Sequence, residues 1–287
     1  MNYNFDQYLD RLNTMSVKYD IVNPSVIPMW VADMDFATAP QITQALMKRA
    51  SHGAYGYVEI PKEYYTCQVD WWHRRHGFTI KEEWIEFCTG VIPSLSVSVA
   101  AMLEPGDKVI IQTPVYNYFN TSIVNNGCKI VENELIYEDN TYRMDLEAFE
   151  DQLVSQKVKL FILCNPHNPV GRAWSRKELQ EIGEICLKHK VIVVSDEIHG
   201  DLMMDGHKHI PFISVDERFK DITITCTAPS KTFNLAGLKN ANMIIPNSLI
   251  KSKVNRASND KEVAEPNIFG VVGLMAAYSE GEEWLDD

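Results

Sequence analysis

Short apolar runs alternate with segments of helical spacing along most of the chain. A short continuous apolar run bounded by turn residues predicts a buried strand, whereas apolar residues three and four positions apart predict a helix. The strands we expect are 84–88, 108–112, 128–131, 159–164, 191–195, 221–225 and 241–245. The helices we expect are 94–103, 116–124, one capped by Asp145, and one opened by the capping box Ser175-x-x-Glu178.

The order of these segments predicts the fold class. Alternation of strands and helices, with strands that are apolar almost throughout, indicates a largely parallel sheet with helices on both faces. We therefore expect a three-layer α/β/α architecture with a mostly parallel sheet. Ligands of such sheets bind at the carboxyl ends of the strands, so the loops that follow the strands are where chemistry is expected.

Length and charge limit the kinds of partner. The 287 residues suffice for one large α/β domain and part of a second. The net charge of −12 argues against a nucleic-acid or anionic-membrane partner, because both attract clustered basic residues. The chain contains no apolar run long enough to span a bilayer, and the first residues lack the features of a signal peptide. These features predict a cytoplasmic protein.

Cysteine and histidine positions give no metal signature. The six cysteines are scattered without a C-x-x-C pair and mostly lie in apolar stretches, so we expect reduced core thiols. Two histidine-containing runs, 73–76 and 207–209, are compatible with metal binding, but no cysteine or acidic cluster completes either of them. We therefore predict no metal site.

The loop after strand 159–164 contains two Asn-Pro pairs, at Asn165 and Asn168. Proline fixes its own φ angle and restricts the residue before it. The loop is therefore expected to be rigid and to hold both asparagine amides in fixed directions. A stiff turn that leads into the Ser175 helix explains the same residues equally well.

The loop after strand 191–195 opens with an acidic pair, Asp196-Glu197, and His199 follows. A carboxylate at the exit of a buried strand is placed to face a bound ligand, and it can hold a protonated pyridine nitrogen. His199 can reach the same ligand. The alternative is a cluster of acids that cap a helix.

The loop after strand 221–225 contains Ser230 and Lys231 among small and apolar residues. A desolvated lysine has a lowered pKa and is a better nucleophile for Schiff-base formation. The serine beside it can hydrogen-bond a phosphate. The alternative is a lysine that buries only its aliphatic stem and reaches solvent.

A fourth element, residues 89–94, precedes an expected helix. Gly90 lets the backbone approach a ligand closely, and the free N–H groups of the following helix can bind an anion. The chain lacks a G-x-G-x-x-G loop after a strand, which disfavours a Rossmann-type nucleotide-binding protein.

Together the four elements resemble the fold-type I pyridoxal 5′-phosphate (PLP) enzymes of the aminotransferase class I/II superfamily. Several segments narrow the resemblance to the MalY/PatB branch of cystathionine β-lyases and related C–S lyases. These segments are 33–40, 55–57, 165–171, 195–201 and 228–238. The resemblance covers essentially the whole chain.

The resemblance implies PLP as the cofactor and assigns roles around its ring. Lys231 forms the Schiff base and then removes the substrate Cα proton. Asp196 pairs with the pyridine nitrogen, and Asn168 hydrogen-bonds the ring 3′-oxygen. Tyr116 stacks on the ring, and His199 occupies the position where many relatives carry a tyrosine that contacts the 3′-oxygen.

The resemblance also implies a phosphate site and a partner. Ser230 and the backbone amides of Val91 and Ile92 hold the phosphate. Tyr57 reaches the cofactor of the neighbouring subunit, so the active form is a homodimer. The other partner is a small amino-acid substrate.

The expected activity is cleavage of cystathionine or related cysteine S-conjugates to a thiol, pyruvate and ammonia. An aminotransferase needs the same residues and stays open as an alternative. A regulatory protein that keeps the PLP fold with impaired catalysis is the second alternative.

The resemblance further implies a domain division. Residues 1–45 form an N-terminal segment that belongs partly to a small domain, and residues 46–280 form the PLP-binding large domain. Residues 281–287 begin a helix that leads, in relatives, to the rest of the small domain. The sequence thus resembles a C-terminally truncated enzyme.

Overall fold

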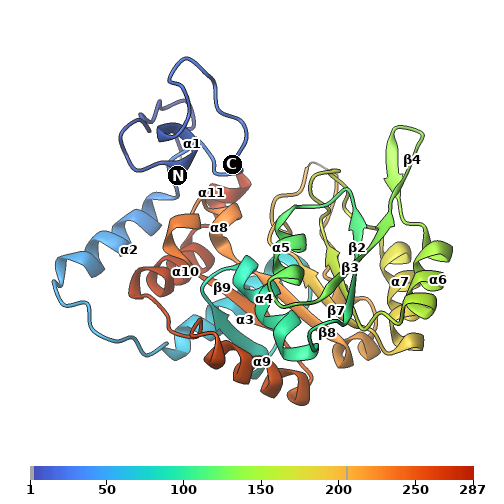
Figure 1. Cartoon of the computed structure of the whole chain (residues 1–287). Helices are drawn as coiled ribbons and strands as arrows, with labels where there is room; N and C mark the ends of the chain where they lie inside the picture. The colour runs from blue at the N-terminus through green and yellow to red at the C-terminus, as the bar shows by residue number, and fades with distance from the viewer. Residues whose placement is uncertain (1–2, 205) are drawn as a thin grey trace.

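The computed structural model describes residues 3–204 and 206–287, and a seven-stranded sheet crosses the centre of this part of the chain (Figure 1). The strand order is β1-β9-β8-β7-β6-β2-β3. Neighbouring strands from β3 to β8 pair in parallel, whereas β9 pairs antiparallel with both β8 and β1. The sheet strands are β1 (Ile85–Cys88), β2 (Lys108–Thr113), β3 (Lys129–Glu134), β6 (Leu160–Cys164), β7 (Ile192–Asp196), β8 (Thr223–Thr227) and β9 (Ala241–Ile244).

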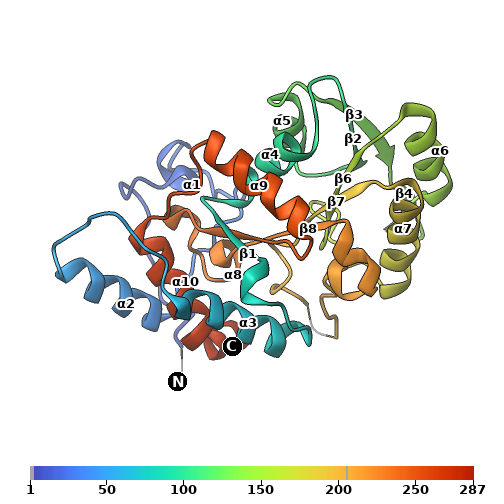
Figure 2. The same ribbon diagram turned by 90° about the horizontal axis from the view of Figure 1, so that it is seen from below.

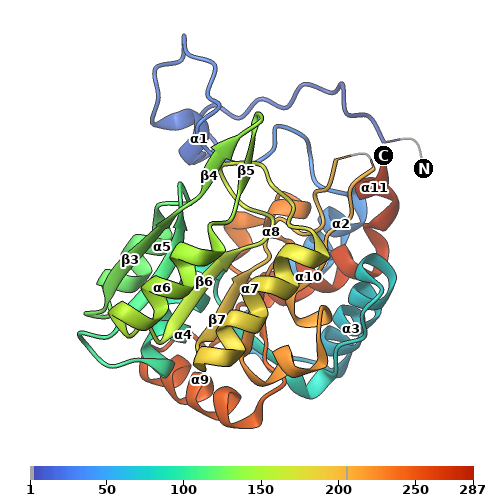
Figure 3. The same ribbon diagram turned by 90° about the vertical axis from the view of Figure 1, so that its right-hand side faces the viewer.

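Helices cover both faces of the sheet. One face packs against α4 (Val91–Met102), α5 (Tyr118–Val124) and α9 (Ser248–Asp260), and the other against α6 (Leu146–Gln156) and α7 (Arg176–His189), as Figure 3 shows from the α6–α7 side. Strand residues alternate between the two cores: Ile111 packs with the first set of helices, and Ile110 with the second. The three-layer architecture with a mostly parallel sheet is therefore confirmed.

A third apolar cluster packs on the β1–β9 end of the sheet (Figure 2). Here α2 (Pro40–Ser51), α3 (Lys62–His76), α10 (Ile268–Glu280) and α11 (Glu282–Asp286) pack around buried aromatic rings. Trp71 and Tyr278 stack with ring centroids 4.8 Å apart. The remaining short helices are α1 (Val17–Asp20), α8 (Pro229–Thr232) and the 3₁₀ turns η1 (Glu82–Trp84), η2 (Phe212–Ser214), η3 (Glu217–Asp221) and η4 (Ala236–Leu238).

Two helices begin where the sequence predicts, whereas α5 begins two residues after its predicted start at residue 116 and α4 also differs. The Asp145 carboxylate accepts from the Ala148 N–H at 3.0 Å, and the Ser175–Glu178 capping box is formed. Helix α4, however, begins at Val91, three residues before the predicted start. Pro93 is the third residue of this helix, and proline is tolerated in a first turn because its missing N–H needs no partner there.

A hairpin of β4 (Ile136–Glu138) and β5 (Thr141–Arg143) was not predicted from the sequence. Its two-residue turn, Asp139-Asn140, has φ angles of 51° and 59°. Asp and Asn tolerate this left-handed backbone, and such turns match the twist of paired strands. The strands are too short and too exposed for an apolar pattern to reveal them.

In the part of the chain that the structure describes, no helix is long and apolar enough to cross a membrane. All six cysteines are buried and unpaired. Within those described residues, no cluster of three or more histidine, cysteine, aspartate or glutamate side chains could hold a metal ion.

Candidate active site

The sheet brings the predicted loops to one edge. Strands β6, β7 and β8 are parallel neighbours, and Cys164, Asp196 and Cys226 lie side by side at their carboxyl ends. The Asn168 loop, the Asp196 loop and the Lys231 segment follow these ends directly. Strand β1 also runs parallel to β8, because both pair antiparallel with β9. The start of α4 therefore lies at the same edge.

The Asn-Pro loop is tied to the loop after β2. The Tyr116 N–H donates to the Asn168 carbonyl at 3.1 Å, and a ring nitrogen of His167 lies 3.0 Å from the Pro114 carbonyl oxygen. The peptide bonds before Pro114, Pro166 and Pro169 are all cis. These contacts bring Tyr116 and Asn168 together at the site edge.

The two asparagines of this loop have different surroundings. Asn165 is buried, and its amide donates to the Ile210 carbonyl at 3.0 Å. The side chain of Asn168 is half-buried and makes no hydrogen bond with the described part of the chain. Asn165 therefore holds the fold, whereas Asn168 is available to a ligand.

Asp196 is a buried carboxylate at the end of β7. It is 6% exposed, and one of its oxygens accepts from the Ile198 N–H at 3.2 Å. Among the described residues it forms no ion pair. Burial raises its pKa to about 7, with a further increase from Glu197, although the charge of Lys231 opposes this shift. A protonated nitrogen in contact with Asp196 would relieve this cost.

Lys231 is half-buried in α8 and likewise makes no hydrogen bond or ion pair with the described chain. Burial lowers the pKa of its ammonium group, while the charges of Asp33 and Asp196 oppose the shift. A lowered pKa increases the fraction of neutral, nucleophilic amine at neutral pH.

The other predicted side chains share this lack of partners. Tyr116, His199 and Ser230 are half-buried, and their side chains make no hydrogen bond with the part of the chain described. Burial raises the pKa of Tyr116 and lowers that of His199. Polar side chains in folded proteins usually find partners. A set of this composition therefore fits a polar, anionic aromatic ligand such as PLP.

The first turn of α4 offers backbone donors to an anion. Val91 and Ile92 are its first two residues, so their N–H groups have no partner within the helix. Gly90 precedes them in an extended conformation, with φ 168°. A Cβ atom added there would lie 3.3 Å from Pro93 Cδ, so the glycine provides room for the turn rather than an unusual backbone angle.

Tyr57 lies apart from this group. Its side chain is fully exposed, and within this chain it contacts none of the site residues. A cavity of about 440 Å³ adjoins the site and is lined in part by Asn168, His199 and Met203.

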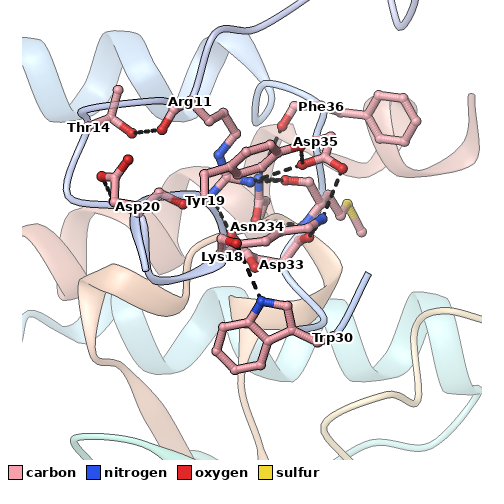
Figure 4. A network of polar contacts seen from close by, with 12 residues as sticks. Arg11, Thr14, Lys18, Tyr19, Asp20, Trp30, Asp33, Asp35, Phe36 and Asn234 are labelled. Atoms are coloured by element: carbon pink, nitrogen blue, oxygen red, sulfur yellow. Dashed lines mark hydrogen bonds and ion pairs between the residues drawn. The ribbon is translucent and has the colours of Figure 1, made fainter. Parts of the chain in front are cut away.

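Asp33 lies near the site, although no role was predicted for it from the sequence and it belongs to a segment that carries the family resemblance. The Asn234 amide donates to the carbonyls of Met34 and Phe36 at 3.0 and 3.1 Å and accepts from the Met34 N–H at 3.1 Å. Asn234 follows Lys231 by three residues, so this clamp brings the 33–36 segment beside α8. Figure 4 shows Arg11 pointing toward Asp33, with which it forms an ion pair.

Comparison with known proteins identifies the class. The aminotransferase class I and II family model matches residues 24–269. Cystathionine beta-lyase PatB from Bacillus subtilis is 46% identical over 289 residues, which cover 99% of this chain and 75% of the relative. Protein MalY from Escherichia coli is 30% identical, with coverage of 99% and 74%. The chain therefore belongs to the aminotransferase class I and II family.

Solved structures agree with this assignment. Cystalysin from Treponema denticola, which contains a PLP cofactor, superposes with a TM-score of 0.96 at 38% identity and covers 100% of this chain and 74% of its own. The PLP-bound C-S lyase from Staphylococcus hominis gives 0.93 at 35% identity, with coverage of 100% and 73%. The prediction of a PLP-dependent enzyme with similarity to the MalY/PatB lyases is confirmed.

Proposed function

We propose that this protein is a carbon–sulfur β-lyase that cleaves cystathionine or related cysteine S-conjugates to a thiol, pyruvate and ammonia. The observation that carries the proposal is the convergence of unpartnered polar side chains at one sheet edge, in a chain 46% identical to a cystathionine β-lyase.

In the proposed complex, the chain's own residues hold PLP at four points. Asp196 pairs with the pyridine nitrogen, and Tyr116 stacks on the ring. Asn168 and His199 face the 3′-oxygen. The phosphate is bound by Ser230 and the backbone N–H groups of Val91 and Ile92. The buried position of Asp196 supports its assignment, because a cation there restores the ionised carboxylate that burial disfavours.

PLP, when bound, supplies an electron sink for negative charge at the substrate Cα. Lys231 takes the Cα proton at its Nζ, and its lowered pKa increases the fraction of neutral amine that can accept that proton. Asp196 holds the positive pyridine nitrogen and thereby favours electron withdrawal from Cα. The sulfur substituent at Cβ then leaves with its bonding electrons.

The assembly that we propose is a homodimer. Tyr57 is fully exposed in the single chain, which supports its assignment to the phosphate in the neighbouring subunit's site. Sedimentation of the PLP-loaded protein should give a dimer. Tyr57→Phe should weaken PLP binding and leave the dimer intact. A monomeric loaded protein would contradict the proposal. The domain division at residues 45 and 280 and the cytoplasmic location stay predictions.

Absorption spectra with PLP test the cofactor assignment first. Wild type should give a borohydride-reducible adduct, and Lys231→Ala should not. Cystathionine should then release pyruvate without any added keto acid. Amino transfer that requires a keto acid, with no pyruvate from cystathionine, would instead select an aminotransferase. An intact adduct with no turnover of either kind would select the regulatory alternative.

A further inference from the structure

The two histidine-containing runs, 73–76 and 207–209, for which no metal site was predicted, meet inside the protein. His76, at the end of α3, and His209 lie edge to face with ring centroids 5.3 Å apart. A ring nitrogen of His76 lies 3.3 Å from Asp201 Oδ1, and one of His209 lies 2.8 Å from Glu197 Oε2. All four side chains are at most 8% exposed. The runs therefore form two buried imidazole–carboxylate pairs.

Other buried donors hydrogen-bond the carboxylate oxygens of Asp201 and Glu197. Trp71 Nε1 donates to Asp201 Oδ1 at 3.2 Å, and Thr232 Oγ1 donates to Asp201 Oδ2 at 3.0 Å. Glu197 accepts from Ser195 Oγ at 2.8 Å and from the Phe212 N–H at 2.9 Å. Every carboxylate oxygen in the two pairs has a partner, which is the condition under which buried charges are tolerated.

The position of these pairs relates them to the site. Thr232 directly follows Lys231, and Glu197 directly follows Asp196. Gly200 allows the close packing, because a Cβ atom there would lie only 2.8 Å from His209 Cδ2. The network therefore anchors the residue next to each of two groups assigned to PLP.

Helix α8 especially needs such an anchor. It contains only four residues, Pro229–Thr232, and one isolated helical turn has little stability of its own. Successive residues of a helix point about 100° apart. Holding the buried Thr232 hydroxyl in place therefore fixes the direction in which the preceding Lys231 leaves the helix.

We propose that Asp201, held by His76, is a positioning residue for Lys231, acting through its hydrogen bond from Thr232. The inference rests on the proposed function, because it assigns to Lys231 the bond with PLP. The network orders Lys231 before the cofactor arrives, so its loss slows formation of the PLP adduct.

Thr232→Val tests the proposal, because valine keeps the shape of threonine and removes the donor. The rate constant for formation of the borohydride-reducible PLP adduct should fall about tenfold. The circular dichroism of the bound cofactor, which reports the orientation of its ring, should weaken. Thr232→Ser should restore both. Thr223→Val is the matched control: Thr223 is equally buried, and its hydroxyl donates to the Phe219 carbonyl at 2.6 Å, outside the network.

The outcomes are distinct. Adduct formation and dichroism at wild-type values in Thr232→Val, or an equal loss in Thr223→Val at matched thermal stability, would overturn the positioning role. If Thr232→Val does not fold, Thr232→Ala, which removes the same hydroxyl without adding a methyl group in its place, should show the slower adduct formation. Wild type that forms no adduct at Lys231 would overturn the proposed function as well.

Discussion

Asp196 and Glu197 are consecutive buried carboxylates at the end of one strand, yet they differ in their hydrogen-bond and ion-pair partners. Glu197 accepts from a hydroxyl and a backbone N–H and pairs with His209. Asp196 accepts from the Ile198 N–H and lacks any cation among the described residues, so burial raises its pKa to about 7. The difference separates a carboxylate that stabilises the fold from one that is left for a ligand.

The same contrast holds for two lysines. The buried Lys18 donates to the Asp33 carbonyl and to the Asp35 carboxylate, each at 2.9 Å (Figure 4). Lys231 makes no such bond with the described chain, and burial lowers its pKa. For these two lysines, therefore, the presence of hydrogen-bond partners rather than the degree of burial separates the residue that stabilises the fold from the one assigned to the site.

The largest expected effect is on Lys231. Lys231→Ala should lower pyruvate release from cystathionine by about 10⁴-fold or more, because the variant loses both the covalent link and the proton acceptor. Lys18→Met is the matched control, and it should reduce stability while leaving the PLP adduct intact. Pyruvate release near the wild-type rate in Lys231→Ala would contradict the assignment.

Glu197→Gln should destabilise the protein by about 3 kcal/mol, because glutamine cannot be an acceptor at both of the positions where the carboxylate oxygens of Glu197 are hydrogen-bonded. Urea unfolding of the cofactor-free protein at pH 7 measures this loss. A change below about 0.5 kcal/mol would show that the Glu197–His209 pair contributes little to the fold.

Asp196→Asn should instead stabilise the cofactor-free protein. The pKa of Asp196 in the folded protein lies above the usual aspartate value. The contribution of Asp196 to stability is therefore present below about pH 4 and lost as the pH rises through about 7. At pH 8 the variant should be about 2–4 kcal/mol more stable than wild type. The gain should shrink as the pH is lowered toward 4.

The cofactor should reverse this result. PLP supplies the cation that Asp196 lacks, so the loaded wild type should be stabilised more by PLP than loaded Asp196→Asn. Unfolding curves with and without PLP give the comparison. Equal stabilisation of both proteins would argue against a contact between Asp196 and the pyridine nitrogen.

The smallest expected effect is on Ser230. Ser230→Ala should weaken PLP binding about five- to tenfold through loss of one phosphate hydrogen bond. The stability of the cofactor-free protein should barely change, because the hydroxyl has no partner among the described residues. Equilibrium titration with PLP measures the affinity, and an unchanged Kd would remove Ser230 from the phosphate site.

The sequence by itself determined the seven strands of the main sheet, the layer architecture and the group of loops that carries the chemistry. These features are local: apolar runs such as 159–164 specify strands, and Asn168, Asp196 and Lys231 each follow a strand end. The family resemblance then supplied the roles, because a lysine or an acid in a loop has several possible explanations.

Only the tertiary structure decided which polar groups are satisfied. The partners of Asn234 lie about 200 residues away, and those of Asp201 come from α3 and α8. No local pattern predicts that His76 meets His209, or that Glu197 is saturated while Asp196 is not. Hydrogen bonds between distant segments depend on packing, and packing is a property of the whole chain.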